Sequence, residues 1–489
     1  MNSQLPINRL PREILILIAT HLDDHKMLIN LTHVCTHWHR TITTYPTFWT
    51  HIRFGGRDMV EPLANLFFER AGGCTLDVHI SPPGFRRRRL SRDQTLPTLS
   101  PGKRITALSV DHTWDRIQEI IDKWGDALSP LQVLVINANQ TSPPFPSMTF
   151  VGHALKHLKL FGLAFIGLDY IRAPNLTVLR LCDNFQTQCS ATRLFDFLEA
   201  TPSLEDVSIH IDSTVIDDVS PPNRTVTLQR VRSILLSISH VPQLASHLIC
   251  PSSTNARLVD VLPGSVDGIF PPSLHEFLEQ YSVGVVDRVV MRVSDQIGRK
   301  ECSLQLHSPS DASFWISYET EQFAGTPPED PDPEWDFSIL FDQAVSALLS
   351  FPLGNVISFS IDIEPPSDFV ANSTEITGRF VEMFKKCPKL HEVVLDSCLP
   401  HCFPIFSQDR TPPIQVLVIK HPEGGSWEEL AEHVTEVARI RHSRGVPLKR
   451  IEIITSLEGN PRVEPLESWV QEVKYRVEPF KRNGRNPWI

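Results

Sequence analysis

The sequence lacks the signals that mark secreted, membrane-spanning and disulfide-stabilised proteins. Its 9 cysteines are scattered, with no CxxC pair, so a disulfide framework is not indicated and a reducing compartment is expected. No apolar run approaches the roughly 18 residues of a membrane span. The short apolar stretch 14–19 is followed by His21, Asp23 and Asp24 instead of small cleavage-site residues, so it does not predict a signal peptide. We therefore expect a protein of the cytosol or the nucleus that binds no membrane.

Positive charge and enzyme motifs are also scarce. Lys and Arg number 46 against 57 Asp and Glu, a net charge of −11, whereas a general nucleic-acid binder needs a basic face to replace counterions at phosphates. The chain contains no GxGxxG, no GxxxxGK[ST] and no GxSxG. The segment 391–395 resembles a zinc-peptidase helix, but Leu395 stands where the second metal ligand would be. We expect a non-catalytic protein that uses no cofactor and binds no nucleic acid.

Proline, by contrast, is abundant. The 40 prolines indicate a chain of short elements with many stops, because proline is excluded from helix interiors and central strands. A chain of 489 residues is too long for one compact core, so several domains or a long repeat array are expected. Hydrophobic residues make up 41% and charged residues 21%, which is typical of a folded protein.

Residues 7–54 predict a module of three short helices. Pro11 suits the first turn of a helix, and Ile14, Ile18 and Leu22 recur on one helical face with Leu15 beside them. This is more apolar surface than one three-turn helix buries in its own small domain, so the module is expected to need a partner. Two further helices are predicted over 27–31 and 33–43, and an aromatic segment follows Pro46.

This pattern resembles the F-box in the order and spacing of about a dozen positions. They are Leu10, Pro11, Glu13, Ile14, Leu15, Leu22, Leu28, Val34, Cys35, Trp38 and Trp49. The resemblance, to F-box proteins of the fungal type, implies a Skp-type adaptor and through it a cullin as partners. The residues that it assigns to adaptor binding are Leu10, Pro11, Ile14, Leu15, Ile18, Leu22, Leu28, Val34, Cys35 and Trp38. Thr36 and His37 stand where basic residues often follow the Val-Cys pair, which leaves open a degenerate F-box.

Two groups of histidines and cysteines could suggest a metal site. The first group alternates along a predicted helix, where alternate side chains diverge by about 200°: His33, Cys35, His37 and His39. The second group is Cys387, Cys398, His401 and Cys402, and repeat geometry already accounts for Cys387 and Cys398. We expect no metal ion at either place.

Beyond residue 60 a motif recurs in which apolar residues stand at the first, fourth and sixth positions. It begins at Ile105, Leu131, Leu155, Leu176, Leu204, Val231, Val286, Val356, Leu390, Ile414 and Leu448. The first six starts are 26, 24, 21, 28 and 27 residues apart, close to the roughly 20–29 residues of leucine-rich repeats. Proline precedes six of the eleven starts by one or two residues, which suits a helix end followed by a strand. Asn139, Asn184 and Cys398 lie eight residues after a start, where leucine-rich repeats place Asn or Cys.

The fold class predicted from these features is α/β: a short three-helix F-box followed by an irregular leucine-rich-repeat-like solenoid with a parallel inner sheet. Helices are expected at 114–127, 191–200, 337–350, 374–386, 465–477 and from 426 onward. The expected domains are an F-box at 1–54, a connector with a possible first repeat at 55–103, and the solenoid at 104–489. The spacing of the motif becomes irregular over 240–350, which indicates either irregular repeats or an inserted segment. There, 286–294, 301–307 and 313–318 predict a β-meander with a turn at Gly298, and 326–334 is an acidic, proline-rich loop.

The function that the resemblance implies is substrate recognition in a Skp–cullin–F-box ubiquitin ligase, by holding a protein substrate near the transferred ubiquitin. Recognition is expected on the inner face of the solenoid, at Ser109, Val135, Lys159, Arg180, Ser208, Leu235, Val394, Val418 and Glu452, of which Lys159, Arg180, Ser208 and Glu452 are the polar candidates. The alternative is an interaction scaffold with a degenerate F-box and no role in ubiquitin transfer. A hydrolase within 240–350 has no positive support.

Overall fold

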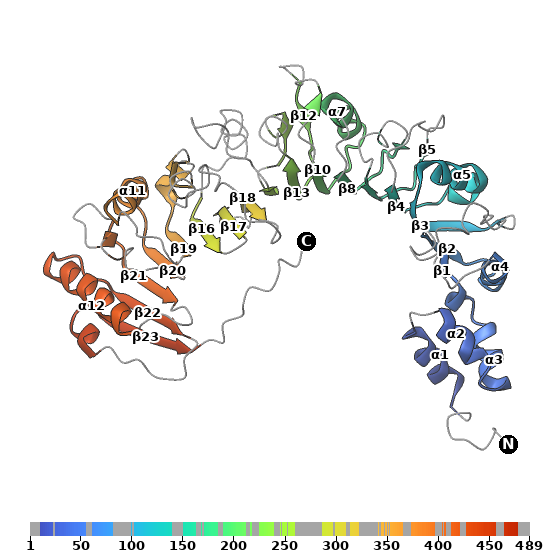
Figure 1. The fold of residues 1–489 in the computed structure, drawn as a ribbon, viewed down its shortest axis with the longest axis horizontal. Coiled ribbons are helices and arrows are strands. Elements are labelled where there is room, and N and C mark those ends of the chain that lie inside the picture. The colour runs from blue at the N-terminus through green and yellow to red at the C-terminus, as the bar shows by residue number, and fades with distance from the viewer. Residues whose placement is uncertain are drawn as a thin grey trace, which may run out of the picture. The chain divides into compact units, whose positions relative to one another are not determined.

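The chain forms two compact units, Met1–Arg230 and Val231–Ile489, and each is described by itself (Figure 1). The structure, a computed structural model, describes residues 10–22, 25–54, 61–81, 99, 102–138, 150–162, 168, 171–183, 189–211, 216–217, 224–238, 245, 247–251, 253–259, 286–296, 299–309, 313–321, 341, 344–346, 348–349, 351, 353–364, 373–396, 403, 405–406, 412–420, 427–455 and 464–477. The predicted domain boundaries at 54 and 103 stay predictions.

The first unit begins with the predicted helical module. It consists of α1 (Arg12–Thr20), α2 (His25–Thr32), α3 (Thr36–Thr43) and the 3₁₀ helix η3 (Pro46–Trp49). Pro11 precedes the first turn of α1, where the missing N–H has no helical partner to lose. The side chains that close the core of this module are Leu15, Leu28, Trp38, Ile42 and Trp49. All three predicted helices are therefore confirmed.

A parallel sheet follows directly from this module. Its strands pair in chain order: β1 (His51–Phe54), β2 (Thr75–Ile80), β3 (Arg104–His112), β4 (Val133–Ala138), β6 (His157–Phe161), β8 (Val178–Asp183) and β10 (Asp206–Ile211). Helices α4 (Glu61–Arg70), α5 (Trp114–Trp124) and α7 (Ala191–Glu199) and the 3₁₀ helix η5 (Gly125–Leu128) connect them. Figure 1 shows α5 and α7 over one face of the strands. The other face is the open face of this sheet.

Short two-residue strands accompany this sheet. β5 (Phe150–Val151) pairs with β7 (Ile171–Arg172), and β9 (Cys189–Ser190) pairs with β11 (Ile216–Asp217). β12 (Val226–Thr227) is the last strand of the first unit.

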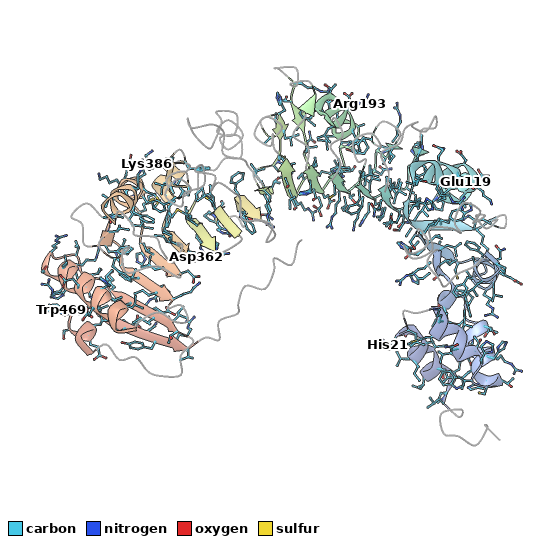
Figure 2. The ribbon with its side chains drawn as sticks, viewed as in Figure 1. His21, Glu119, Arg193, Asp362, Lys386 and Trp469 are labelled. Atoms are coloured by element: carbon cyan, nitrogen blue, oxygen red, sulfur yellow. The ribbon has the colours of Figure 1, made fainter. Side chains whose placement is uncertain are left out.

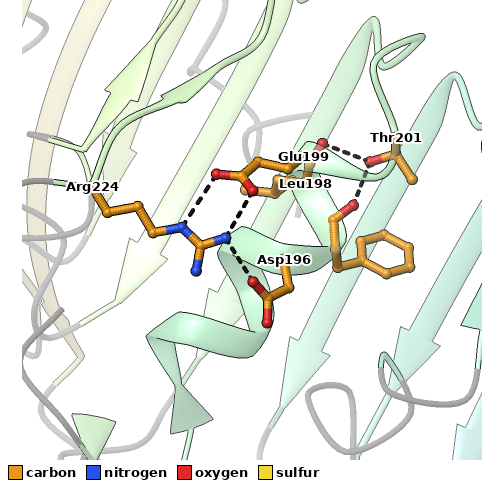
Figure 3. Close-up of polar contacts among 6 residues, drawn as sticks. Asp196, Leu198, Glu199, Thr201 and Arg224 are labelled. Carbon is orange, nitrogen blue, oxygen red and sulfur yellow. Dashed lines mark hydrogen bonds and ion pairs between the residues drawn. The ribbon is translucent and has the colours of Figure 1, made fainter. Parts of the chain in front are cut away.

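A cluster of polar contacts holds Arg224, just before β12, to α7 (Figure 3). Arg224 donates to Asp196 at 2.6 Å and to Glu199 at 2.8 and 3.2 Å. These hydrogen bonds, to Glu199 first and then to Asp196, raise the pKa of the Arg224 guanidinium. Buried Thr201 donates to the carbonyls of Phe197 and Leu198 at the end of the same helix. The contacts satisfy polar groups where α7 ends.

The second unit also contains a mixed but mainly parallel sheet. Its strands are β13 (Ser233–Ile238), β15 (Asn255–Val259), β16 (Arg288–Gln296), β17 (Arg299–His307), β18 (Ser313–Glu321), β19 (Ser358–Glu364), β20 (Glu392–Asp396), β21 (Val416–Lys420), β22 (Arg450–Thr455) and β23 (Glu472–Val477), with β14 (Leu248–Ile249) outside it. They pair in the order β13–β15–β18–β17–β16–β19–β20–β21–β22–β23. The helical segments are η8 (Leu353–Asn355), α11 (Ser373–Lys385), α12 (Trp427–Ser443) and η10 (Glu464–Ser468).

The meander predicted in the irregular region is confirmed as β16, β17 and β18, which pair antiparallel. The three strands lie across the sheet in the reverse of their order in the chain. The last strand, β18, pairs with β15, and the first, β16, pairs with β19, both in parallel. The predicted turn at Gly298 lies outside the described residues, as do the acidic loop 326–334, Asn139, Asn184, Cys398, His401 and Cys402.

The recurring apolar motif marks the start of a buried strand in both units. All eleven motif starts are buried, from Ile105 to Leu448. Burial then alternates along the strands, as in β4, because side chains of successive residues point to opposite faces. Predicted helices at 114–127, 191–200, 374–386 and from 426 onward are confirmed as α5 with η5, α7, α11 and α12. Most of 337–350 lies outside the described residues.

One helix prediction is wrong. Residues 465–477 contain the short 3₁₀ helix η10 and then strand β23, which pairs with β22. Val473, Tyr475 and Val477 recur at every second residue, the period of a strand, and β-branched and aromatic side chains favour that conformation. The free edge of β22 supplies the partner that makes the strand the more stable choice.

Candidate protein-interaction surfaces

The N-terminal module leaves apolar side chains uncovered. Ile14 is 42% exposed and Leu17 55% exposed on α1, while Met27 on α2 is 52% exposed and Val34 is 39% exposed. Ile18 and Leu22 are half-buried beside them. Exposed apolar side chains on so small a helical unit are typical of a site of protein contact. The face that the sequence predicts to be unsatisfied is therefore in part open within the described chain.

Three residues predicted to touch the adaptor are enclosed in the module's own core. Leu15, Leu28 and Trp38 have at most 6% of their surface exposed. A three-helix unit needs its few large apolar side chains to fill its own core. In this structure these three side chains therefore pack inside the module and are not exposed to a partner. Of the remaining predicted residues, Pro11 is exposed, and Leu10 and Cys35 are half-buried.

Two exposed residues, Leu17 and Met27, were not among the predicted contacts. Leu17 lies two positions after the core residue Leu15, and Met27 directly precedes the core residue Leu28. The signal that could have identified Leu17 is the apolar width of α1: when one face of a helix fills the core, apolar side chains on the remaining arc face outward.

His37 fixes the entry of the chain into α1. Its Nε2 lies 3.2 Å from the carbonyl oxygen of Leu10, and because a carbonyl only accepts, Nε2 carries the donated proton. Arg12 donates to the Thr44 hydroxyl at 3.5 Å. Both contacts link the Leu10-Pro11 edge to α3, so His37, the departure from the F-box pattern, supports the edge that the pattern assigns to the adaptor.

Trp49 joins the module to the first strands. It is fully buried, and its indole N–H donates to the Ile42 carbonyl at 3.0 Å. Phe67 of α4 packs edge-on against the ring at 4.8 Å, and the Arg70 guanidinium lies over it at 4.4 Å. Contacts to Phe67 and Arg70 of α4 therefore link the module to the segment between β1 and β2.

A cavity of about 790 Å³ opens between the module and the first strands. Leu22, Leu28 and Phe48 contribute apolar surface, while Arg53 and His79 line it from the open face of β1 and β2. His79 is engaged with the Ser109 hydroxyl at 2.9 Å. Arg53 is exposed and forms no ion pair with another described residue.

The predicted recognition residues of the first unit do share one row of the open face. Ser109 pairs in register with Val135, Val135 with Lys159, Lys159 with Arg180, and Arg180 with Ser208. In Figure 2, Glu119 on α5 and Arg193 on α7 belong to the helical side of this unit. Whether this row contacts a substrate stays a prediction.

The second unit places its predicted residues differently. Glu452 is 8% exposed and accepts an ion pair from Arg476 at 3.1 Å, so it is not an open recognition side chain. Val418 is buried with Val416 and Ile454, and Val394 packs against this cluster. Asp362, labelled in Figure 2, accepts a hydrogen bond from Arg292 at 2.6 Å. Ion-pair and aliphatic contacts therefore cover Glu452 and Val418 in this unit.

Two searches of the described residues bear on other classes of site. No three His, Cys, Asp or Glu side chains in the described part of the chain are grouped as metal ligands. Among the helices described, none combines the length and the apolar character that crossing a bilayer requires.

Comparison with known proteins assigns the N-terminal module. Residues 7–55 match the family model described as F-box-like. The match covers α1 to β1 and ends before α4. No curated protein matches the chain.

Proposed function

We propose that this chain is a substrate-recognition subunit of a Skp–cullin–F-box ubiquitin ligase, acting in the cytosol or the nucleus. An F-box-like domain suggests an adaptor-binding role, and the chain carries one at residues 7–55. The observation that carries the proposal is the uncovered apolar surface on that same domain, formed by Ile14, Leu17, Met27 and Val34.

Burial of these side chains by a partner would contribute favourable free energy to a complex. Fully burying an aliphatic side chain of this size contributes about 1.5–3 kcal/mol. Four partly exposed side chains, with the exposed edge at Pro11, therefore supply an apolar centre of the kind found in protein–protein interfaces. A three-helix module of this size is marginal in isolation, which gives a covering partner a further stabilising role.

The mechanism that we propose is proximity. The leucine-rich-repeat-like units would hold a protein substrate, and the adaptor would connect the module to the cullin and the ubiquitin-charged enzyme. Trp49, Phe67 and Arg70 hold the module against the first strands, so it and the open face of the first unit move together. Such a link raises the effective concentration of substrate lysines at the enzyme. The chain itself supplies no reacting group in this scheme.

The experiment that tests the proposal is co-expression of the full chain with a Skp-type adaptor and cullin. We expect the proteins to co-purify, and the complex to be lost in Leu10→Ala/Pro11→Ala, which removes the edge that His37 supports. A matched control is Lys385→Ala, an exposed position on α11. Absence of the complex with the natural chain would instead support a scaffold that takes no part in ubiquitin transfer.

A further inference from the structure

Two cations meet on the open face of the first unit. Lys159 of β6 and Arg180 of β8 stand directly opposite each other in the parallel register. Like charges at opposed positions of neighbouring strands destabilise a sheet. An anion bound between the Lys159 and Arg180 side chains would offset this repulsion.

The chain itself neutralises this pair only in part. Asp206 of β10 approaches Arg180 at 3.8 Å, a long contact between two exposed side chains. Lys159 forms no ion pair with any described residue. Two positive charges and one negative charge leave a net single positive charge. That matches one carboxylate better than a phosphate group, which carries about −1.5 to −2.

Apolar side chains surround these cations on the same face. Val133 and Val135 of β4, Phe161 of β6 and Val178 of β8 are half-buried and point to the open side. A bound carboxylate would therefore lie among aliphatic and aromatic groups, where screening by water is weaker. Such a surface selects ligands that combine acidic with aliphatic side chains.

A third cation lies at the start of the same row. Arg53 pairs in register with His79, His79 with Ser109, Ser109 with Val135, and Val135 with Lys159. Arg53 also lines the cavity beside Phe48 and Leu22, so a cation and an apolar pocket stand together there. Four strand spacings of about 4.8 Å place Arg53 roughly 19 Å from Lys159, the length of about six extended residues.

We propose that this row binds an extended acidic and aliphatic segment of a substrate protein. One carboxylate pairs with Lys159 and Arg180, and a second, about six residues away, pairs with Arg53. Aliphatic side chains between the two carboxylates pack on the row and in the cavity. The proposal rests on the proposed function for its biological meaning, but the surface binds such a segment whether or not the adaptor is present.

The test is fluorescence anisotropy with the full chain and labelled synthetic peptides of about nine residues. The first peptide has two glutamates six residues apart with leucine, valine and serine between them. The others carry glutamines at those positions, glutamates three residues apart, or phosphoserines six residues apart. We expect the first peptide to bind about tenfold more tightly than the glutamine and the short-spaced peptides, with an affinity that falls as salt is raised.

Charge-reversal variants complete the test. Lys159→Glu/Arg180→Glu and Arg53→Glu are expected to weaken the first peptide about tenfold or more. The control Arg193→Glu/Lys385→Glu, on exposed helix positions, changes the net charge as much as the double variant and should leave binding unchanged. Equal binding of glutamate and glutamine peptides, or an equal loss in the control, would overturn the proposal. Tighter binding of the phosphoserine peptide would overturn the assignment to carboxylates.

The adaptor separates this inference from the proposed function. Adaptor affinity is measured on Lys159→Glu/Arg180→Glu, and we expect it to be unchanged because both residues lie on strands beyond the residues that match the F-box-like model. Peptide failure with intact adaptor binding would refute the inference alone, whereas adaptor failure with intact peptide binding would refute the proposed ligase role alone.

Discussion

Cys387 follows α11 and is completely buried. Its thiol donates to the Met383 carbonyl at 3.6 Å, and burial raises the pKa of the thiol to about 12. Because thiolate is the form that reacts, Cys387 should stay protonated and unmodified by iodoacetamide in the folded protein at pH 8 and also at pH 10.

Mass spectrometry of the alkylated native protein checks this prediction. Half-buried Cys74 serves as the internal comparison and should be modified first. Labelling of Cys387 at the rate of Cys74 at pH 8 would show that the end of α11 is open to solvent.

Arg441 is a buried cation whose guanidinium donates hydrogen bonds to backbone carbonyls of two other segments. It is 3% exposed and donates to the carbonyls of Phe406 at 3.3 Å and Ile414 at 3.1 Å. Burial, and secondarily Arg444, lowers its pKa to about 10, so the guanidinium is still charged at pH 7. Arg441→Met keeps most of the volume but leaves both carbonyls without this donor, and we expect a loss of about 1–3 kcal/mol in the free energy of unfolding.

Urea denaturation measures that loss. Arg444→Met is the matched control, because Arg444 is exposed and its removal relieves repulsion of Arg441. The control should change stability by about 0.5 kcal/mol or less. If Arg441→Met were as stable as the control, the two carbonyl contacts would have no net stabilising effect.

At the scale of single elements, two glycines allow the effect of backbone conformation on stability to be measured without a change in packing. Gly378 lies inside α11, and Gly445 follows α12 with φ +74°, where its N–H and that of Val446 bond to carbonyls of the last turn. A Cβ at either position meets no atom within 4 Å. Gly378→Ala should therefore stabilise the protein by about 1 kcal/mol, and Gly445→Ala should destabilise it by a similar amount.

The opposite signs are the result to look for in thermal or urea unfolding. Gly354→Ala, with open space and no left-handed φ, should change stability in the same direction as Gly378→Ala and opposite to Gly445→Ala. Destabilisation by Gly378→Ala would contradict the helical conformation of α11 at that residue.

The elements that the sequence predicted well are those with a strong local period. α1, α5, α7 and α12 and the strand after each motif start follow directly from where apolar residues recur. β23 was missed because its strand state depends on pairing with β22, a contact that no local pattern contains. The order of β16, β17 and β18 across the sheet could not be predicted from the sequence either, because it depends on which edges of β15 and β19 are available for pairing.

At the scale of the whole molecule, the candidate site was predicted as a region more reliably than as residues. The apolar face of α1 was identified, but helical periodicity does not say which side of a broad apolar face turns inward. Leu15 was therefore placed on the surface that Leu17 occupies. The meeting of Lys159 and Arg180 depends on strand register, and Glu452 is closed off by Arg476 from the next strand; neither follows from spacing alone.

The central claim is that the apolar surface of α1 binds a Skp-type adaptor. Its most direct test is isothermal titration of the purified adaptor into the natural chain and into Ile14→Asp/Leu17→Asp. Both residues are exposed, so the variant should unfold at the same urea concentration as the natural chain, while two lost apolar contacts should weaken binding about a hundredfold or more. Unchanged affinity in the folded variant, or no binding by the natural chain, would contradict the account.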